Sequence, residues 1–170
     1  MATPLNTSSG SFDALYRDSA RDLYAYVRTL LGGDAAAEDV TALAFERAYR
    51  RRATFDARRG SQRGWLFGIA RNAALDELRR RRRSLPLVGE LPDERAEAPD
   101  EEAELAVRRT TVRAALAGLP PRDRELLALK FHGGLSNAEL AAVLGTSESN
   151  AGTRLHRAVT KLREACNAPA

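Results

Sequence analysis

The stretch SNAELAAVLGTSESNAGTRLHRAVTKLRE, from Ser136 to Glu164, decides how the C-terminal part of this chain folds. Ser136 and Glu139 form a capping-box pattern that predicts the start of a short helix. Gly145 predicts a tight turn, after which Thr146 or Ser147 caps a longer helix that runs to about Glu164. A short helix, a glycine turn and a longer basic helix are the parts of a helix-turn-helix, whose second helix enters the major groove of DNA.

The second helix of this stretch has one side suited to DNA and another suited to a core. Residues 153, 156, 157 and 160 recur at a spacing of three and four, so they share one side of the helix. Leu155, Ala158 and Leu162 take the other side and are expected to be buried. An ordinary helical bundle produces the same pattern, so a purely structural interpretation stays open at this point.

Helical spacing also dominates the rest of the chain, and strand signals are scarce. Pro121 begins a helix at a position where proline is tolerated, and its apolar side holds Leu126, Leu127 and Phe131. Nearer the N-terminus three helices are predicted, capped by Ser11, Asp34 and Ser61. The sequence therefore predicts an all-α protein.

Charge is distributed unevenly along the 170 residues, whose formal net charge is +4. Residues 1–85 carry a net charge of +6, residues 86–104 a net charge of −7, and the remainder +5. The acidic strip holds three prolines and little to bury, which is typical of a flexible linker. The sequence thus predicts two small helical domains, residues 11–85 and 101–166, joined by a flexible acidic linker over residues 86–100.

Two features of this charge pattern have more than one interpretation. The acidic linker is either a solvated spacer or an internal mimic of nucleic acid that screens the basic domains in the free protein. The positive charge is almost all arginine, since Lys130 and Lys161 are the only lysines. Arginine suits phosphates and guanine edges, but a GC-rich genome also produces an excess of arginine and alanine.

The helix predicted after Ser61 ends in five consecutive arginines, Arg79 to Arg83. They circle the helix and outnumber the nearby acids, so the block either binds a polyanion or frays into solvent. Trp65 and Phe67, close to Arg58-Arg59 and Arg63, predict an aromatic surface amid positive charge, of the kind that stacks on single-stranded nucleic acid. From spacing alone, a core position is the better interpretation of Trp65.

No pattern for catalysis or metal binding stands out. His132 and His156 lie on different predicted helices, and the single cysteine, Cys166, excludes a Cys-rich zinc cluster. We therefore expect no enzymatic activity, no catalytic or metal-binding residue and no cofactor. Because the first eleven residues are polar and no apolar run is long enough to span a bilayer, we expect a soluble, cytoplasmic protein without membrane insertion.

Six motifs follow one another along the chain: AEDV (37–40), FERAY (45–49), WLFGIARNAALD (65–76), LPPRDRELL (119–127), GLS (134–136) and RLHRA (154–158). Together they resemble the extracytoplasmic-function sigma factors of bacterial RNA polymerase, within the sigma-70 family. The resemblance covers roughly Phe12 to Glu164. Each motif alone is weak, whereas their order is specific.

The resemblance implies a promoter-specificity subunit that binds core RNA polymerase through its clamp coiled coil and flap. It implies that the first domain melts the minus-10 promoter element and holds its non-template single strand. The second domain would read the minus-35 element as duplex DNA, so both forms of promoter DNA are expected partners. An anti-sigma factor is a further candidate partner.

The resemblance also assigns roles to individual residues, in three groups. The core-polymerase group is Asp39, Leu43, Glu46 and Arg47. The minus-10 group is Arg63, Trp65, Asn72, Arg79 and Arg80. The minus-35 group is Thr153, Arg154, His156, Arg157 and Lys161, with Arg154 and Lys161 expected on phosphates.

Three places depart from the family pattern. Ala42-Leu43 stand where many members carry Gln-Glu, Gly68 where members often carry Arg or Lys, and Gly152 where a basic residue commonly faces DNA. One rival interpretation is a helix-turn-helix regulator that never engages polymerase and binds duplex DNA by itself. Another is a helical adaptor without nucleic acid, which leaves Arg79 to Arg83 unexplained.

Overall fold

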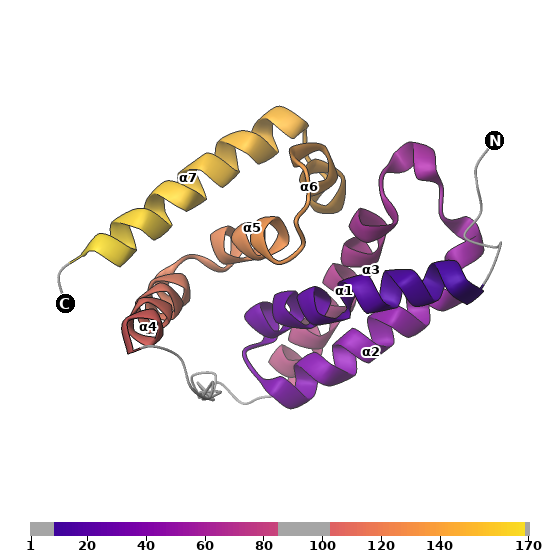
Figure 1. Cartoon of the computed structure of the whole chain (residues 1–170), viewed down its shortest axis with the longest axis horizontal. Coiled ribbons are helices and arrows are strands. Elements are labelled where there is room, and N and C mark those ends of the chain that lie inside the picture. Colours follow the sequence, from indigo (N-terminus) through magenta and orange to yellow (C-terminus); the bar gives the residue numbers. More distant parts are fainter. Residues whose placement is uncertain (1–8, 85–102, 169–170) are drawn as a thin grey trace.

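The computed structural model of this chain describes residues 9–84 and 103–168. Over these ranges it forms seven α-helices and two short 3₁₀ turns, with no strand (Figure 1). The predicted all-α fold is therefore confirmed. The acidic linker predicted over residues 86–100 lies outside the described residues.

Three long helices make up the N-terminal body: α1 (Ser9–Leu31), α2 (Asp34–Arg50) and α3 (Gln62–Ser84). Two 3₁₀ turns, η2 (Arg52–Thr54) and η3 (Ala57–Arg59), connect α2 to α3. Each helix packs against the other two, and the side chains fully buried between them include Leu23, Tyr26, Val27 and Leu66. This packing holds α3 in place beside the η2–η3 segment.

The predicted helix starts are confirmed for one of the three N-terminal caps. Ser61 caps α3, because its Oγ accepts a hydrogen bond from the Gly64 N–H at 3.0 Å. The prediction was wrong for Ser11, which lies inside α1. It was also wrong for Asp34, because Gly33 is the N-cap of α2 and the Asp34 carboxylate accepts from the Arg28 guanidinium and the Tyr24 hydroxyl instead. A charged donor competes well with a backbone N–H for a carboxylate.

Four helices make up the C-terminal body: α4 (Ala103–Gly118), α5 (Pro121–Phe131), α6 (Asn137–Leu144) and α7 (Glu148–Asn167). Both hydrogen bonds of the Ser136–Glu139 capping box are present at the start of α6. Gly145 ends α6 with φ 65°, a left-handed conformation that favours glycine. Ser147 then caps α7 by accepting from the Asn150 N–H, so α6 and α7 form the predicted helix-turn-helix.

Two aromatic side chains lie on the opposite side from the one predicted. Phe131 was expected on the apolar side of α5 but is 68% exposed, because α5 ends there and the chain turns at Gly133. Phe67 was expected on the surface but is fully buried, with its ring centroid 5.5 Å from that of Tyr26. Phe67 follows Leu66 along the side of α3 that faces the core. Of the two aromatic residues predicted at the surface, only Trp65 remains there.

The two bodies pack against each other, with α1 against α5 and α3 against α6 (Figure 1). Their buried apolar side chains belong to one continuous cluster. Within the described part of the chain, no helix combines the length and the apolar character needed to cross a membrane.

Candidate nucleic-acid interface

A hollow of about 580 Å³ lies beside the first turns of α3 and is named here the Trp65 pocket. The N-terminal body lines it with the η2–η3 segment and one side of α3, and the C-terminal body lines it with α6. The lining residues used below are Phe55, Arg59, Trp65 and Asn72 from the first body, and Glu139, Ala142 and Val143 from the second.

Trp65 and Asn72 combine a stacking surface with a polar reading group. The Trp65 ring is half-buried, packs against the core, and lies tilted against the Phe55 ring with centroids 5.6 Å apart. Asn72 lies two turns further along α3, and its amide offers both hydrogen-bond donors and an acceptor. Enzymes that extrude a base hold it by aromatic stacking and by hydrogen bonds to its Watson–Crick edge. The pocket has both kinds of group.

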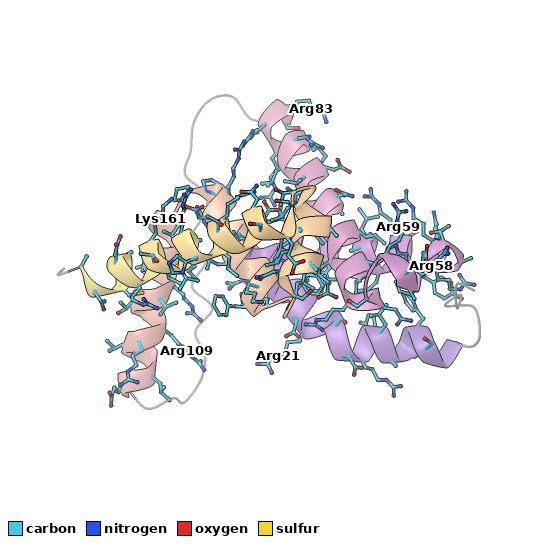
Figure 2. The ribbon with its side chains drawn as sticks, turned by 90° about the horizontal axis from the view of Figure 1, so that it is seen from above. Arg21, Arg58, Arg59, Arg83, Arg109 and Lys161 are labelled. Atoms are coloured by element: carbon cyan, nitrogen blue, oxygen red, sulfur yellow. The ribbon has the colours of Figure 1, made fainter. Side chains whose placement is uncertain are left out.

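The segment before α3 adds a positive charge that the sequence placed near Trp65 but that the minus-10 group does not include. Asp56 caps η3 and also accepts hydrogen bonds from the Arg58 guanidinium, which hold the pKa of its carboxyl below the usual value. Arg59 lines the pocket, and Figure 2 shows Arg58 and Arg59 projecting from the same region. A local signal was available, since a capping Asp followed by two arginines fixes where the cations lie. No local sequence signal predicted the contact between the rings of Phe55 and Trp65.

Three of the five predicted minus-10 residues lie away from the Trp65 pocket. Arg63 is turned into the contact between the bodies, where it pairs with Asp22 at 2.6 Å and donates to backbone carbonyls of α5's C-terminal turn. Arg79 and Arg80 lie some fourteen residues beyond Trp65, which is about 21 Å along a helix. They pair with Asp76 and Glu77. The structure therefore brings Trp65 and Asn72 together, but not the three arginines.

The arginine block at the end of α3 is partly neutralised. Arg79, Arg80 and Arg81 each pair with an acid of the same helix, and Arg81 also donates to the Leu31 carbonyl. The hydrogen bond from Arg80 holds the pKa of Glu77 below its usual value. Over the residues that the structure describes, Arg82 and Arg83 have no ion pair, and Figure 2 shows Arg83 far from Arg58 and Arg59. The charge available to a polyanion is thus concentrated at the last turn.

The predicted faces of α7 are confirmed by burial. Thr153, His156 and Arg157 are exposed, whereas Ala158 is fully buried and the leucines at 155 and 162 pack against the core. Arg154 is half-buried, and the Lys161 ammonium lies 2.6 Å from the Asp123 carboxylate. The Lys161 side chain remains about half exposed beside this contact. The minus-35 group therefore forms one solvent-facing surface.

Two of the departures from the family pattern lie beside the same helix. A Cβ placed on Gly152 would lie 3.4 Å from the Asn137 amide nitrogen, and one on Gly68 would lie 4.0 Å from a methyl of Val143. Asn137 and Val143 both belong to α6. Both glycines thus lie where another element approaches α6.

The core-polymerase group lies along α2. Asp39 and Glu46 are exposed and Leu43 is half-buried between them on the same side. Glu46 pairs with Arg50 at 2.7 Å, whereas Arg47 reaches toward Asp76 of α3 at 3.7 Å. Three of the four residues are thus available together to a partner. Among the described residues, no group of His, Cys, Asp and Glu is arranged to hold a metal ion.

An exposed basic helix-turn-helix and an aromatic pocket lined by an amide are features of DNA-binding proteins. Two family models match the chain: sigma-70 region 2 over residues 15–84, and sigma-70 region 4 over residues 109–162. Together they cover both helical bodies.

Curated relatives agree with these matches. The chain is 34% identical over 152 residues to the ECF RNA polymerase sigma factor SigL of Mycobacterium tuberculosis, covering 88% of this chain and 85% of that protein. It is also 34% identical over 155 residues to the ECF RNA polymerase sigma factor BldN of Streptomyces coelicolor, covering 89% of this chain but 59% of BldN. This chain belongs to the extracytoplasmic-function sigma factors, the subunits that give RNA polymerase its promoter specificity.

Solved structures show the same fold. The sigma factor RpoE of Bartonella quintana, in complex with the anti-sigma factor NepR, matches with a TM-score of 0.78 and 23% identity, covering 94% of this chain and 98% of that one. CnrH, in complex with the cytosolic domain of CnrY, matches with a TM-score of 0.69 and 24% identity, covering 98% of this chain and 94% of that one.

Proposed function

We propose that the N-terminal domain, residues 11–85, holds one flipped base of the minus-10 non-template strand in the Trp65 pocket. The observation that carries this proposal is the pairing of an aromatic wall, Trp65 with Phe55, and the Asn72 amide in one hollow. Its volume of about 580 Å³ falls within the range of roughly 300–1,000 Å³ of ligand pockets. Trp65 would stack on the base, Asn72 would read its edge, and Arg59 would neutralise the neighbouring phosphate.

The arginines of the minus-10 group would contact the backbone rather than the base. Arg79 and Arg80 are exposed near the end of α3, beside Arg82 and Arg83, so they suit phosphates outside the flipped nucleotide. Arg63 can join them only when it leaves its contacts with the C-terminal body. Phosphate contacts position a protein on DNA without carrying sequence information.

The C-terminal domain, residues 101–166, would read the minus-35 element as duplex through α7. Thr153, His156 and Arg157 are exposed on one side, and over the described residues Arg157 makes no ion pair that would have to be broken. A free guanidinium can donate two hydrogen bonds to guanine. Arg154 and Lys161 flank this face and would contact phosphates.

Core RNA polymerase would dock on α2 through Asp39, Leu43, Glu46 and Arg47, with the half-buried Leu43 supplying an apolar contact. Residues 86–100 would link the two DNA-reading domains. No catalytic role is proposed for any residue, and the site of action would be the cytoplasm, where the polymerase works. An anti-sigma factor of the kind seen with RpoE is a further proposed partner.

Reconstitution with core RNA polymerase tests this function. The protein is added to core enzyme and a library of promoter fragments, and the transcribed templates are selected and sequenced. We expect transcripts that depend on the protein and templates that share two conserved elements. A regulator that does not engage polymerase would instead bind duplex DNA by itself and give no protein-dependent transcript; that result would refute the proposal.

A further inference from the structure

Asn150, the third residue of α7, lies on the same side of the helix as Thr153 and Arg157. Residues 150, 153 and 157 recur at a spacing of three and four, and all three side chains are exposed. Asn150 therefore extends this exposed face by one turn toward the start of α7. In a helix-turn-helix, the N-terminal residues of the second helix contact base edges. Asn150 lies in this part of α7, although the minus-35 group does not include it.

The backbone at the start of α7 is firmly held. The Asn150 N–H donates to the Oγ of the Ser147 cap at 3.2 Å. The next residue, Ala151, is fully buried, so the first turn of α7 is anchored to the core beside Asn150. Just before the cap, the Thr146 N–H donates to the Ala141 carbonyl at 3.0 Å. The backbone on both sides of the cap is thus fixed, and the position of the Asn150 amide depends on its side-chain contacts.

The Asn150 side chain makes one such contact. Its Nδ2 donates to the Thr146 Oγ1 at 2.6 Å. An asparagine amide offers two N–H donors and one carbonyl acceptor. Among the residues that the structure describes, the amide has no other partner, so one N–H and the Oδ1 remain available. The side chain thus presents one donor and one acceptor, side by side, to solvent.

This pair of groups matches one base in particular. In the major groove adenine presents its N7 acceptor beside its N6 amino donor, and asparagine binds both at once. Guanine presents two acceptors there, cytosine a donor alone, and thymine an acceptor and a methyl group. Ordering a side chain on binding costs free energy. Because Thr146 already orients the Asn150 amide, part of this cost is removed before DNA binds.

We propose that Asn150 selects an adenine in the minus-35 element and that Thr146 is the positioning residue that orients its amide. This inference rests on the proposed function of α7. Asn150 and Arg157 are seven residues apart, which is about 10 Å along a helix. Successive bases of a strand are about 3.4 Å apart along the duplex. The adenine bound by Asn150 and the guanine bound by Arg157 should therefore lie within about three base pairs of each other.

A purely structural role for the bond between Asn150 and Thr146 makes a different prediction. If the bond only stabilised the start of α7, its loss would lower the melting temperature and weaken binding to every DNA sequence alike. A base contact instead gives a preference at one base pair, and that preference disappears with the amide. Base preference, measured position by position, separates the two roles.

Transcription from a complete set of minus-35 variants provides this measurement. A promoter selected with core polymerase is prepared with each minus-35 base pair changed in turn to the three alternatives. Runoff transcription is compared for core polymerase carrying the wild-type protein, Asn150→Ala or Asn167→Ala. Asn167 is the matched control, because it is an exposed asparagine at the end of the same helix, about 25 Å beyond Asn150.

We expect the wild-type protein to lose at least about fivefold in transcription when one particular adenine is changed. Asn150→Ala should show no preference at that base pair and keep its preferences at the others. Replacing the same adenine by 7-deazaadenine, which lacks the N7 acceptor, should lower transcription with the wild-type protein and leave Asn150→Ala unaffected. Asn167→Ala should behave as the wild type at every position.

Two conservative variants give an independent test. Asn150→Asp keeps the size of the side chain, and an acid in the first turn suits the helix dipole, so the fold should be retained. A carboxylate accepts from the amino group of cytosine, so the preferred base at this pair should change from adenine to cytosine. Thr146→Val keeps the shape of the side chain but removes the hydroxyl. It should weaken the preference for adenine without changing the preferred base.

Several results would overturn the inference and leave the proposed function standing. They are a selected minus-35 element that requires no adenine, an unchanged base preference in Asn150→Ala, and an equal loss at every minus-35 position in that variant. Retained preference for adenine in Asn150→Asp would have the same meaning. A wild-type protein that gives no transcript with core polymerase would count against the proposed function and this inference together.

Discussion

The two DNA-facing surfaces of this sigma factor differ in their exposure. The face of α7 that carries Thr153, His156 and Arg157 is open to solvent, whereas the Trp65 pocket is a hollow lined in part by α6. The difference has a physical reason. A row of polar and charged side chains is well solvated, whereas exposing aromatic surface to water costs free energy. On the proposed roles, the duplex-reading face belongs to one helix, whereas the strand pocket is built from both bodies.

The largest effect is expected on the open face. Arg157→Ala should lower transcription from a selected promoter by about 5- to 150-fold, corresponding to the roughly 1–3 kcal/mol of a bidentate contact with guanine. Binding to core polymerase should be unchanged. Runoff transcription and a core-binding assay measure the two quantities.

Arg163→Ala is the matched control for this variant. Arg163 is an exposed arginine of the same helix that lies two turns beyond His156, past the residues expected to reach base edges. It removes the same charge, so a comparable loss of transcription in Arg163→Ala would show that α7 acts only through its overall charge.

The Trp65 pocket should respond at a different step. Asn72→Ala should reduce open-complex formation by about tenfold, with little change in closed-complex binding. The reason is that the flipped base would lose its hydrogen bonds to the Asn72 amide, which are worth about 1–3 kcal/mol. Permanganate reactivity of melted thymines measures opening, and gel mobility measures closed binding. Asn72→Asp keeps the size but removes the amide donors and should behave alike. Equal losses at both steps would remove Asn72 from the melting role.

A smaller effect is expected at the edge of the open face. Lys161→Ala should weaken duplex binding by about twofold on all sequences. It should also reduce the slope of log affinity against log salt concentration by about one. The effect is small because Lys161 already pairs with Asp123. Fluorescence titrations at several salt concentrations provide the slope. A change in sequence preference would mean that Lys161 reads a base instead.

The smallest effect concerns pH and the contact between the bodies. Burial at the contact between the bodies lowers the pKa of His132, against an opposing contribution from Asp22. The neutral form therefore stabilises this contact, and this stabilisation is lost as the pH falls through the ordinary histidine range near 6.5 toward the lowered value. The melting temperature should therefore fall on going from pH 7.5 to 5.5. The same fall in His132→Gln would assign it to another group.

The sequence predicts the open face better than the Trp65 pocket because the signals differ in range. The Ser136 cap, the Gly145 turn and the spacing of residues 153, 156 and 157 are local, and each of them is confirmed. The lining of the pocket includes Glu139, which contacts Ser61 from 78 positions away. No local pattern predicts such a contact, and it also explains why Arg63, predicted to bind DNA, is turned toward α5.

Two misassigned residues of the N-terminal body have the same cause. Phe67 was predicted from its basic neighbours, but its position beside Leu66 directs it to Tyr26 in the core. Asp34 has the composition of a cap, yet Arg28 and Tyr24 of the preceding helix compete for its carboxylate. In both cases tertiary partners overrode a correct local tendency.

Fluorescence energy transfer between the two bodies during promoter opening tests the central claim most directly, namely that the two bodies bind separate promoter elements. One label is placed on Cys166, near the end of α7, and the other on Arg21→Cys of α1, a helix to which no DNA or polymerase contact is assigned. We expect high transfer in the free protein and a fall in transfer, at or before the appearance of melted DNA, when core polymerase and promoter are added. Open complexes that form while the transfer stays at its free value would contradict the account.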